Sequence, residues 1–174
     1  KKKRWKLPPD VKTPMTQAYL PELDCTPELD ADDHQYFQEL IGMLRWATEL
    51  GRVDVLHETS LLSQYQASPR EGHLEQALHI FAFLKKKPKL TLYMDPSLPN
   101  IDYKDFTANP EEFKEYYRDA EEEMPHRMPK PRGTPTASTA FVDSSHAANR
   151  VARKSHSGHI IFTNGAPVKW LSRR

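Results

Sequence analysis

The chain has 174 residues, with 25 basic and 24 acidic side chains and a formal net charge of +1. This balance excludes a general attraction to nucleic acid, so any such binding must come from local basic patches. The one cysteine, Cys25, excludes an internal disulfide framework and a cysteine-based zinc site, and it is typical of a reducing compartment. No apolar run approaches the roughly 20 residues that a membrane span needs. We expect an intracellular protein, in the cytoplasm or nucleus, without a membrane partner.

Residues 1–32 are predicted to be an extended lead-in. The first seven, KKKRWKL, are compatible with a solvated tail or with a nucleic-acid contact. Residues 8–32 are rich in proline and acidic groups, and Thr13-Pro14 and Thr26-Pro27 favour extended backbone. The chain begins without methionine and ends at Arg174, which we interpret as a piece of a longer protein.

Residues 33–94 are predicted to form a three-helix unit. The first helix is expected to start near Asp32 or Asp33, since either can cap free backbone N–H groups, and to end at Gly51. Its buried face follows the i, i+3, i+4, i+7 spacing of Phe37, Leu40, Ile41 and Leu44. Further apolar residues widen that face and predict that this helix is covered on more than one side: Met43, Trp46, Ala47 and Leu50.

Two more helices are expected after it. The second spans about 53–64, with an inward stripe of Val55, Leu56, Thr59, Leu62 and Tyr65. The third should start at a capping box in which Ser68 is the N-cap, with Pro69 next and Glu71 three residues on. Its buried face is predicted to hold Leu74, Ala77, Leu78, Phe81 and Leu84. Short connections favour compact packing.

After the helices come a short strand and then an acidic, proline-rich linker, predicted over residues 95–135. Alternation over 90–94 predicts a short strand. Residues 95–124 hold ten acidic and three basic side chains with aromatics between them, and 124–135 is broken by prolines. So many aromatics would be unnecessary in a disordered linker, so we expect this acidic arm to pack against another surface, with one helical turn after Asn109-Pro110.

Residues 136–174 are predicted to form an antiparallel meander of strands at about 138–143, 158–163 and 167–172. Asn164-Gly165 is a strong signal for the second hairpin turn. No helix follows to cover this sheet, so it is unfinished as written. The expected fold class is α+β, with a helical unit, a long acidic linker and an incomplete sheet.

Asp143 is the strongest candidate for chemistry. A carboxylate at the end of an apolar strand can supply an oxygen ligand to Mg²⁺, although two-metal nuclease sites need several carboxylates. On composition alone, an aspartate that starts a turn is the favoured interpretation. His146, His156 and His159 lack partners at zinc-site spacing, and Ser144, Ser145 and His146 lack the arrangement of a nucleophile with its base.

Two basic clusters are candidates for phosphate contacts. The first is Lys85, Lys86, Lys87 and Lys89, and the second is Arg150, Arg153 and Lys154. Basic side chains contact phosphates without sequence specificity. The alternative is structural, since positive charge at a helix C-terminus complements the helix dipole and a basic hairpin loop is merely exposed.

Two stretches resemble a known family. The first, 36–87, is similar to the segment after the polymerase palm in copia-type retrotransposon Pol proteins. Its matching residues are Tyr36, Leu40, Ile41, Gly42, Leu44, Trp46, Arg52, Asp54, Ser60, Leu61, Leu62, Ser63, Pro69, His73, Ala77, Leu84 and Lys85. The second, 141–174, resembles the start of the family's RNase H domain. Its matching residues are Asp143, Ala147, Arg153, Lys154, Ser155, Ser157, Gly158, Gly165, Ala166, Pro167, Trp170 and Ser172.

The resemblance implies thumb-like helices that hold a template–primer duplex, followed by a truncated RNase H-like sheet. Asp143 would be its first Mg²⁺-binding, catalytic aspartate, and the partners would be an RNA–DNA hybrid or template–primer duplex and the rest of the polyprotein. The family's polymerase Asp-Asp motif should precede residue 1 and the other nuclease carboxylates should follow residue 174, so this chain alone should have neither activity. Ser145 and His146 depart from the family pattern. A non-enzymatic interaction module or a domesticated remnant is the alternative.

Overall fold

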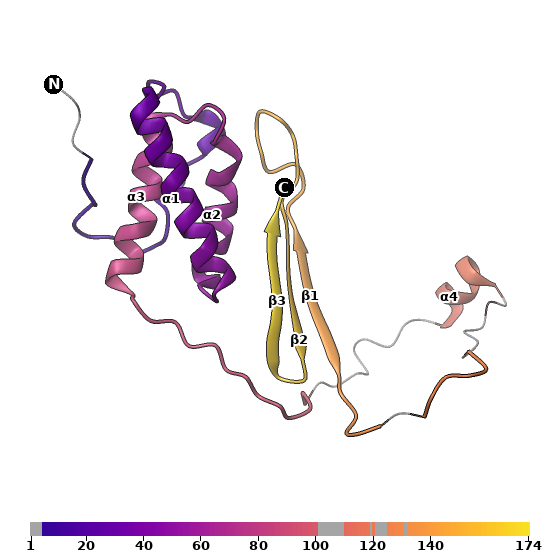
Figure 1. Cartoon of the computed structure of the whole chain (residues 1–174). Helices are drawn as coiled ribbons and strands as arrows, with labels where there is room; N and C mark the ends of the chain where they lie inside the picture. The colour runs from indigo at the N-terminus through magenta and orange to yellow at the C-terminus, as the bar shows by residue number, and fades with distance from the viewer. Residues whose placement is uncertain (1–4, 101–109, 119, 121–124, 131) are drawn as a thin grey trace.

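The structure is a computed structural model in which residues 5–100, 110–118, 120, 125–130 and 132–174 are described. Three helices stand together beside a three-stranded sheet, and a fourth helix lies apart on a long excursion (Figure 1). The elements are α1 (Ala31–Glu49), α2 (Leu56–Leu62), α3 (Glu71–Lys86), α4 (Pro110–Tyr117), β1 (Ser138–Ser144), β2 (Ser157–Thr163) and β3 (Ala166–Arg173). The α+β prediction is confirmed.

Helix α1 begins two residues earlier than predicted. Its N-cap is Asp30, whose carboxylate accepts the Asp33 N–H at 2.9 Å. The predicted inward face is confirmed, since Phe37, Leu40, Ile41 and Leu44 are buried. The prediction of a second covered side is wrong: Met43, Trp46 and Leu50 are 50%, 68% and 67% exposed.

The second predicted helix is confirmed as one helical segment whose two ends are 3₁₀ turns. A 3₁₀ turn at Val53–Val55 leads into α2, and another at Ser63–Tyr65 follows it. Val55, Thr59 and Leu62 from its predicted stripe are buried.

Helix α3 starts later than its sequence signal indicates. Its N-cap is Arg70, not Ser68, and the Arg70 N–H donates to His73 Nδ1 at 3.0 Å. The Glu71 N–H, which a capping box at Ser68 would have used, instead donates to the Pro27 carbonyl at 3.0 Å. A distant segment therefore supplies the cap that a local hydrogen bond was expected to provide.

The lead-in belongs to the helical core. Val11 is 3% exposed and Pro21 is fully buried, and Trp5, Met15, Tyr19 and Leu29 pack against the same core. The segment also contains a 3₁₀ turn, Pro21–Leu23, where no regular element was expected. It covers the side of α3 that carries Gln76, whose side-chain oxygen accepts the Thr16 N–H at 3.0 Å. Residues 1–4 of the basic tip lie outside the described residues.

The sheet has the antiparallel order β1-β2-β3, as predicted, and its strands end within two residues of the predicted limits. Asn164 turns the second hairpin with a φ of +54°. The predicted strand at 90–94 is wrong: this segment is extended but pairs with no strand. Only the next residue, Asp95, forms a bridge, and its partner is Gly165 in the turn.

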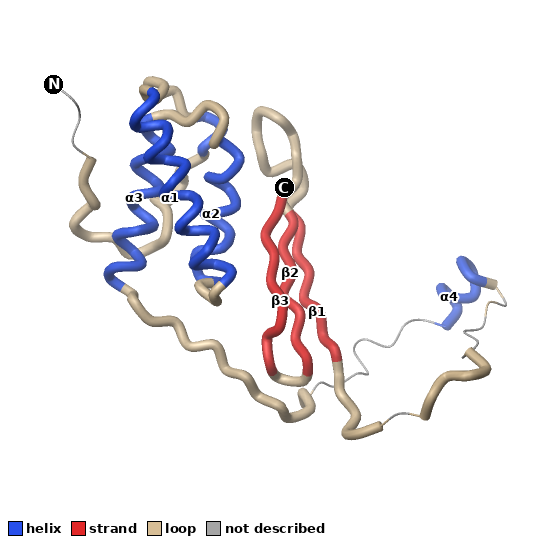
Figure 2. The backbone as a smooth tube through the Cα atoms, viewed as in Figure 1, coloured by secondary structure: helices blue, strands red, loops and turns tan. Residues whose placement is uncertain are grey.

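The sheet docks on the helical unit through one edge. Strand β3 runs beside α2 (Figure 2). The Trp170 Nε1–H donates to the Thr48 carbonyl at 2.8 Å, and the Ser60 hydroxyl donates to the Ser172 carbonyl at 2.8 Å. Much of the sheet stays open, because Phe141 and Val142 are 59% and 74% exposed.

The start of the acidic arm packs on the β2–β3 turn. The Gly165 N–H donates to the Ser97 carbonyl at 3.2 Å, which holds the arm to the β2–β3 turn. The helical turn expected after Asn109-Pro110 is confirmed as α4, but its Tyr116 and Tyr117 are 79% and 61% exposed. The rest of that expectation falls on 101–109, 119 and 121–124, outside the described residues.

Candidate metal and nucleic-acid sites

Asp143 lies within β1, not in a turn. It pairs with Gly158 of β2, and the chain leaves the strand only after Ser144. Its exposed side chain borders a shallow depression of about 250 Å³ lined by 141–143 and 158–160. The carboxylate is therefore exposed to solvent, while strand pairing fixes the backbone that carries it.

The fit of Asp143 to Mg²⁺ is partial. Its carboxylate is a suitable oxygen ligand, and Mg²⁺ often takes only one or two ligands from protein side chains. However, across the described ranges no group of three or more His, Cys, Asp or Glu side chains is placed to hold a metal ion. Asp143 can supply one ligand, and the described residues do not complete a two-metal site.

The lysine cluster lies at the C-terminal end of α3, where all four side chains are exposed. The Lys86 ammonium is 2.6 Å from an Asp10 carboxylate oxygen, and this hydrogen bond and charge hold the pKa of Asp10 below its ordinary value. The Lys87 ammonium lies 5.2 Å from the centroid of the Phe83 ring. Lys85 and Lys89 therefore carry the cluster's most available charges.

Arg153 and Lys154 are exposed on the loop between β1 and β2. The loop is shaped by Asn149, whose side-chain oxygen accepts the Ala152 N–H at 2.7 Å, while Arg153 has a φ of +52°. This loop and the lysine cluster lie at opposite ends of the helical unit (Figure 1). The structure thus does not bring the two predicted basic clusters together.

The three histidines of this region also do not converge. His146 is exposed on the loop, His159 lies on β2, and His156 turns toward the helices. The Ser145 hydroxyl accepts the backbone N–H of His156 at 3.0 Å, so it serves the loop rather than a nucleophilic centre. The arrangement supports neither zinc binding nor nucleophilic catalysis.

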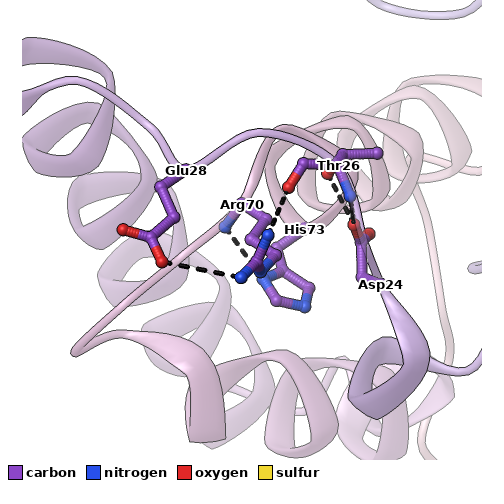
Figure 3. Close-up of polar contacts among 5 residues, drawn as sticks. All are labelled: Asp24, Thr26, Glu28, Arg70 and His73. Carbon is purple, nitrogen blue, oxygen red and sulfur yellow. Dashed lines mark hydrogen bonds and ion pairs between the residues drawn. The ribbon is translucent and has the colours of Figure 1, made fainter.

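A polar cluster that sequence reasoning missed fixes the lead-in to the start of α3 (Figure 3). The Asp24 carboxylate accepts from the Thr26 N–H at 2.8 Å and from the Thr26 and Tyr19 hydroxyls. The Thr26 hydroxyl oxygen in turn accepts the Gly72 N–H at 2.9 Å. The Arg70 guanidinium donates to the Thr26 carbonyl at 2.6 Å. We call Asp24, Thr26, Arg70 and His73 the latch.

The electrostatics of the latch indicate a structural role. Burial acts to raise the pKa of Asp24, but the hydrogen bonds from Thr26 and Tyr19 outweigh it and leave that pKa lowered. Burial lowers the pKa of His73, which is 2% exposed and stacks on Tyr65 with ring centroids 4.4 Å apart. A neutral His73 fits its contacts, because Nδ1 accepts from the Arg70 N–H and Nε2 lies 3.0 Å from the Pro21 carbonyl. The spacing Asp24-x-Thr26, typical of a local side-chain turn, was the available signal.

Comparison with known proteins gives one similarity. The chain is 25% identical over 138 residues to a Saccharomyces cerevisiae (strain ATCC 204508 / S288c) protein named for the transposon Ty5-1. The match takes in 79% of this chain and 33% of that protein, so the chain spans about a third of its relative's length. No family model matches, and no solved structure matches.

This similarity supports a retrotransposon-related protein. The match is longer than either residues 1–94 or residues 95–174 alone. It therefore includes part of the helical unit and part of the segment that follows it. Among the described residues, no helix combines the length and apolar character required to cross a bilayer.

Proposed function

We propose that the chain is part of a copia-type retrotransposon Pol polyprotein, joining the end of reverse transcriptase to the start of RNase H. One observation carries this proposal. The block that resembles the thumb folds as a helical unit, and the block that resembles RNase H folds as an antiparallel meander with Asp143 on its first strand. Both are in the order that the family has, and they dock on each other through α2 and β3.

In this proposal Asp143 provides a metal ligand for cleavage of the RNA strand of an RNA–DNA hybrid. Mg²⁺, when bound with further carboxylates, would supply charge stabilisation and an activated water. The chain's own contribution is to hold one carboxylate on a paired strand with its oxygens open to solvent. Lys85 and Lys89 would contact phosphates of the duplex, a contact that adds affinity without sequence specificity.

The test is to extend the chain through its downstream coding sequence and assay RNA–DNA hybrid cleavage with Mg²⁺. We expect cleavage by the extended protein, none by residues 1–174 alone, and loss of at least about a hundredfold with Asp143→Asn, the order of effect expected for a group that stabilises charge in the reaction. Ser144→Ala, an exposed neighbour of Asp143 on the same strand, is the control and should retain activity. Full cleavage by Asp143→Asn would overturn the assignment.

A second candidate function is a protein-interaction module, and the exposed stripe of α1 favours it. Tyr36, Met43, Trp46 and Leu50 are 36%, 50%, 68% and 67% exposed along this helix. Their spacing places them on one side of the helix, so they form an apolar strip that a partner helix could cover.

Duplex binding by fluorescence anisotropy separates the two functions. If the chain binds a hybrid duplex through the lysine cluster, the double variant Lys85→Gln and Lys89→Gln should weaken binding and reduce the slope of log affinity against log salt by about 2. The matched control is Lys12→Gln with Lys130→Gln, both exposed elsewhere. Undetectable duplex binding by the parent chain, together with self-association or partner capture lost on Trp46→Ser, would favour the interaction module.

A further inference from the structure

A pair of histidines joins the sheet to the helical unit. His57 lies on α2 and His156 ends the loop that leads into β2, and their ring centroids are 4.9 Å apart at an interplanar angle of 73°. His156 Nε2 lies 2.6 Å from the Ser172 hydroxyl on β3. The Ser172 carbonyl accepts the Ser60 hydroxyl of α2, so these four residues form one continuous contact across the junction.

The surroundings of His156 favour its neutral form. Its ring is partly buried, and its Nδ1 is buried without a hydrogen-bond partner among the described residues. Burial lowers the pKa of His156, and the neighbouring His57 and Arg174 charges lower it further.

The other charged groups here do not neutralise a protonated His156. Glu22, Glu58, Lys154 and Arg174 line the same cavity of about 360 Å³ as the two histidines. Glu22 accepts the Arg150 N–H at 3.1 Å, and the Arg174 guanidinium donates to the Gln64 side chain at 2.8 Å. Among the described contacts, neither glutamate forms an ion pair with either histidine.

We propose that His57 and His156 form a pH-sensitive clasp that keeps the sheet docked on α2 when His156 is neutral and releases it when His156 is protonated. A positive charge on His156 would lie in a partly buried site beside the His57 ring and near Arg174, and partial burial strengthens its repulsion by that cation. Release of the sheet would break the Ser60–Ser172 and Trp170–Thr48 hydrogen bonds. It would also free the loop that carries Arg153 and Lys154.

The direction of the pH dependence follows from proton uptake. The docked state disfavours protonated His156, whose ordinary pKa is 6.5. Docking is therefore fully favoured above that pH and is lost as the pH falls below it, because the undocked state binds more protons. The ratio of docked to undocked molecules falls by up to about tenfold per pH unit for each proton taken up.

The indole N–H of Trp170 reports docking directly, because it donates across the junction to Thr48. We would follow its NMR signal in the whole chain from about pH 7.5 to about pH 5, together with helical circular dichroism and the His156 ring resonances. We expect the Trp170 signal to move to its solvated position while helical content stays constant. The measured His156 pKa should lie below 6.5.

His156→Gln removes the titrating ring and His57→Gln removes its neighbour, so each should reduce the change of the docking ratio by up to about tenfold per pH unit. His146→Gln, an exposed histidine on the same loop, is the matched control and should behave as the parent chain. A Trp170 signal constant over this range, a His156 pKa at or above its ordinary value, or an unchanged transition in His57→Gln would each overturn the clasp. If a variant fails to dock at neutral pH, the His156 pKa measured in the parent chain decides the test instead.

Discussion

The helical unit and the sheet are stabilised in different ways. The helices enclose a core that includes Phe37, Ile41, Leu44, Leu74 and Ile80, all fully buried. The sheet has comparable apolar content, but Phe141, Val142, Val168 and Leu171 are between 41% and 74% exposed. The helical unit buries its apolar faces against its own elements, whereas the sheet packs on the helical unit only along β3, beside α2 and the end of α1.

This difference explains why a three-stranded meander persists here. A sheet of this size needs a packed face, and α2 and the end of α1 provide one for β3. Because that support lies at one edge, the strength of the junction should govern the order of the sheet. The helical unit should fold whether or not the sheet is docked.

Core truncation gives the largest expected contrast between the regions. Leu44→Ala removes a fully buried side chain and should lower the free energy of unfolding by about 2–5 kcal/mol. Val142→Ala, at a position 74% exposed, should cost less than about 1 kcal/mol. Urea denaturation followed by circular dichroism measures both. Similar decreases would mean that the sheet face is covered, and repeating the measurement at lower protein concentration would test for self-association.

Substitutions at two helical glycines should change the free energy of unfolding by smaller amounts and in opposite directions. A Cβ at Gly72 would lie 1.8 Å from an Asp24 carboxylate oxygen, so Gly72→Ala should break the latch and cost about 1–3 kcal/mol. A Cβ at Gly42 meets nothing within 4 Å, so Gly42→Ala should stabilise α1 by up to about 1 kcal/mol. Thermal melting compares the two variants. A higher melting temperature for Gly72→Ala would show that the lead-in does not pack against the start of α3 in solution.

The smallest expected effect is the pH dependence of the helical unit. Burial lowers the pKa of His73, so the unfolded chain binds more protons below the ordinary value of 6.5 and stability falls as the pH drops through that region. The slope contributed by one histidine is at most about 1.4 kcal/mol per pH unit. His73→Gln should be less stable at neutral pH but show a flatter dependence, measured by urea denaturation at several pH values.

His79→Gln, on the same helix, is the control for that experiment. His79 lies 3.0 Å from the Thr13 carbonyl through Nε2, a contact that glutamine can also make. If His79→Gln flattened the pH dependence as much as His73→Gln, the burial of His73 would not be its cause.

Short-range patterns in the sequence predicted most of the regular structure. Helical spacing identified the buried face of α1, and Asn164-Gly165 identified the second hairpin, because both signals depend on backbone geometry within a few residues. The same reasoning placed Asp143 beside the first strand and the lysines at a helix end. It misplaced the start of α3, since the Pro27 carbonyl and the Thr26 hydroxyl, more than 40 positions away, take the N–H groups that a local cap would use.

The sequence by itself determined the periodic faces of the helices, the hairpin turn and the order of the two blocks. Only the tertiary structure decided that Trp46 stays exposed, that the segment 90–94 finds no strand partner, that the two basic clusters lie apart and that His57 meets His156. The physical reason is that period and turn geometry are properties of neighbouring residues. Burial, strand pairing and charge contacts depend on which distant residues pack against a segment. The sequence of that segment alone does not specify those residues.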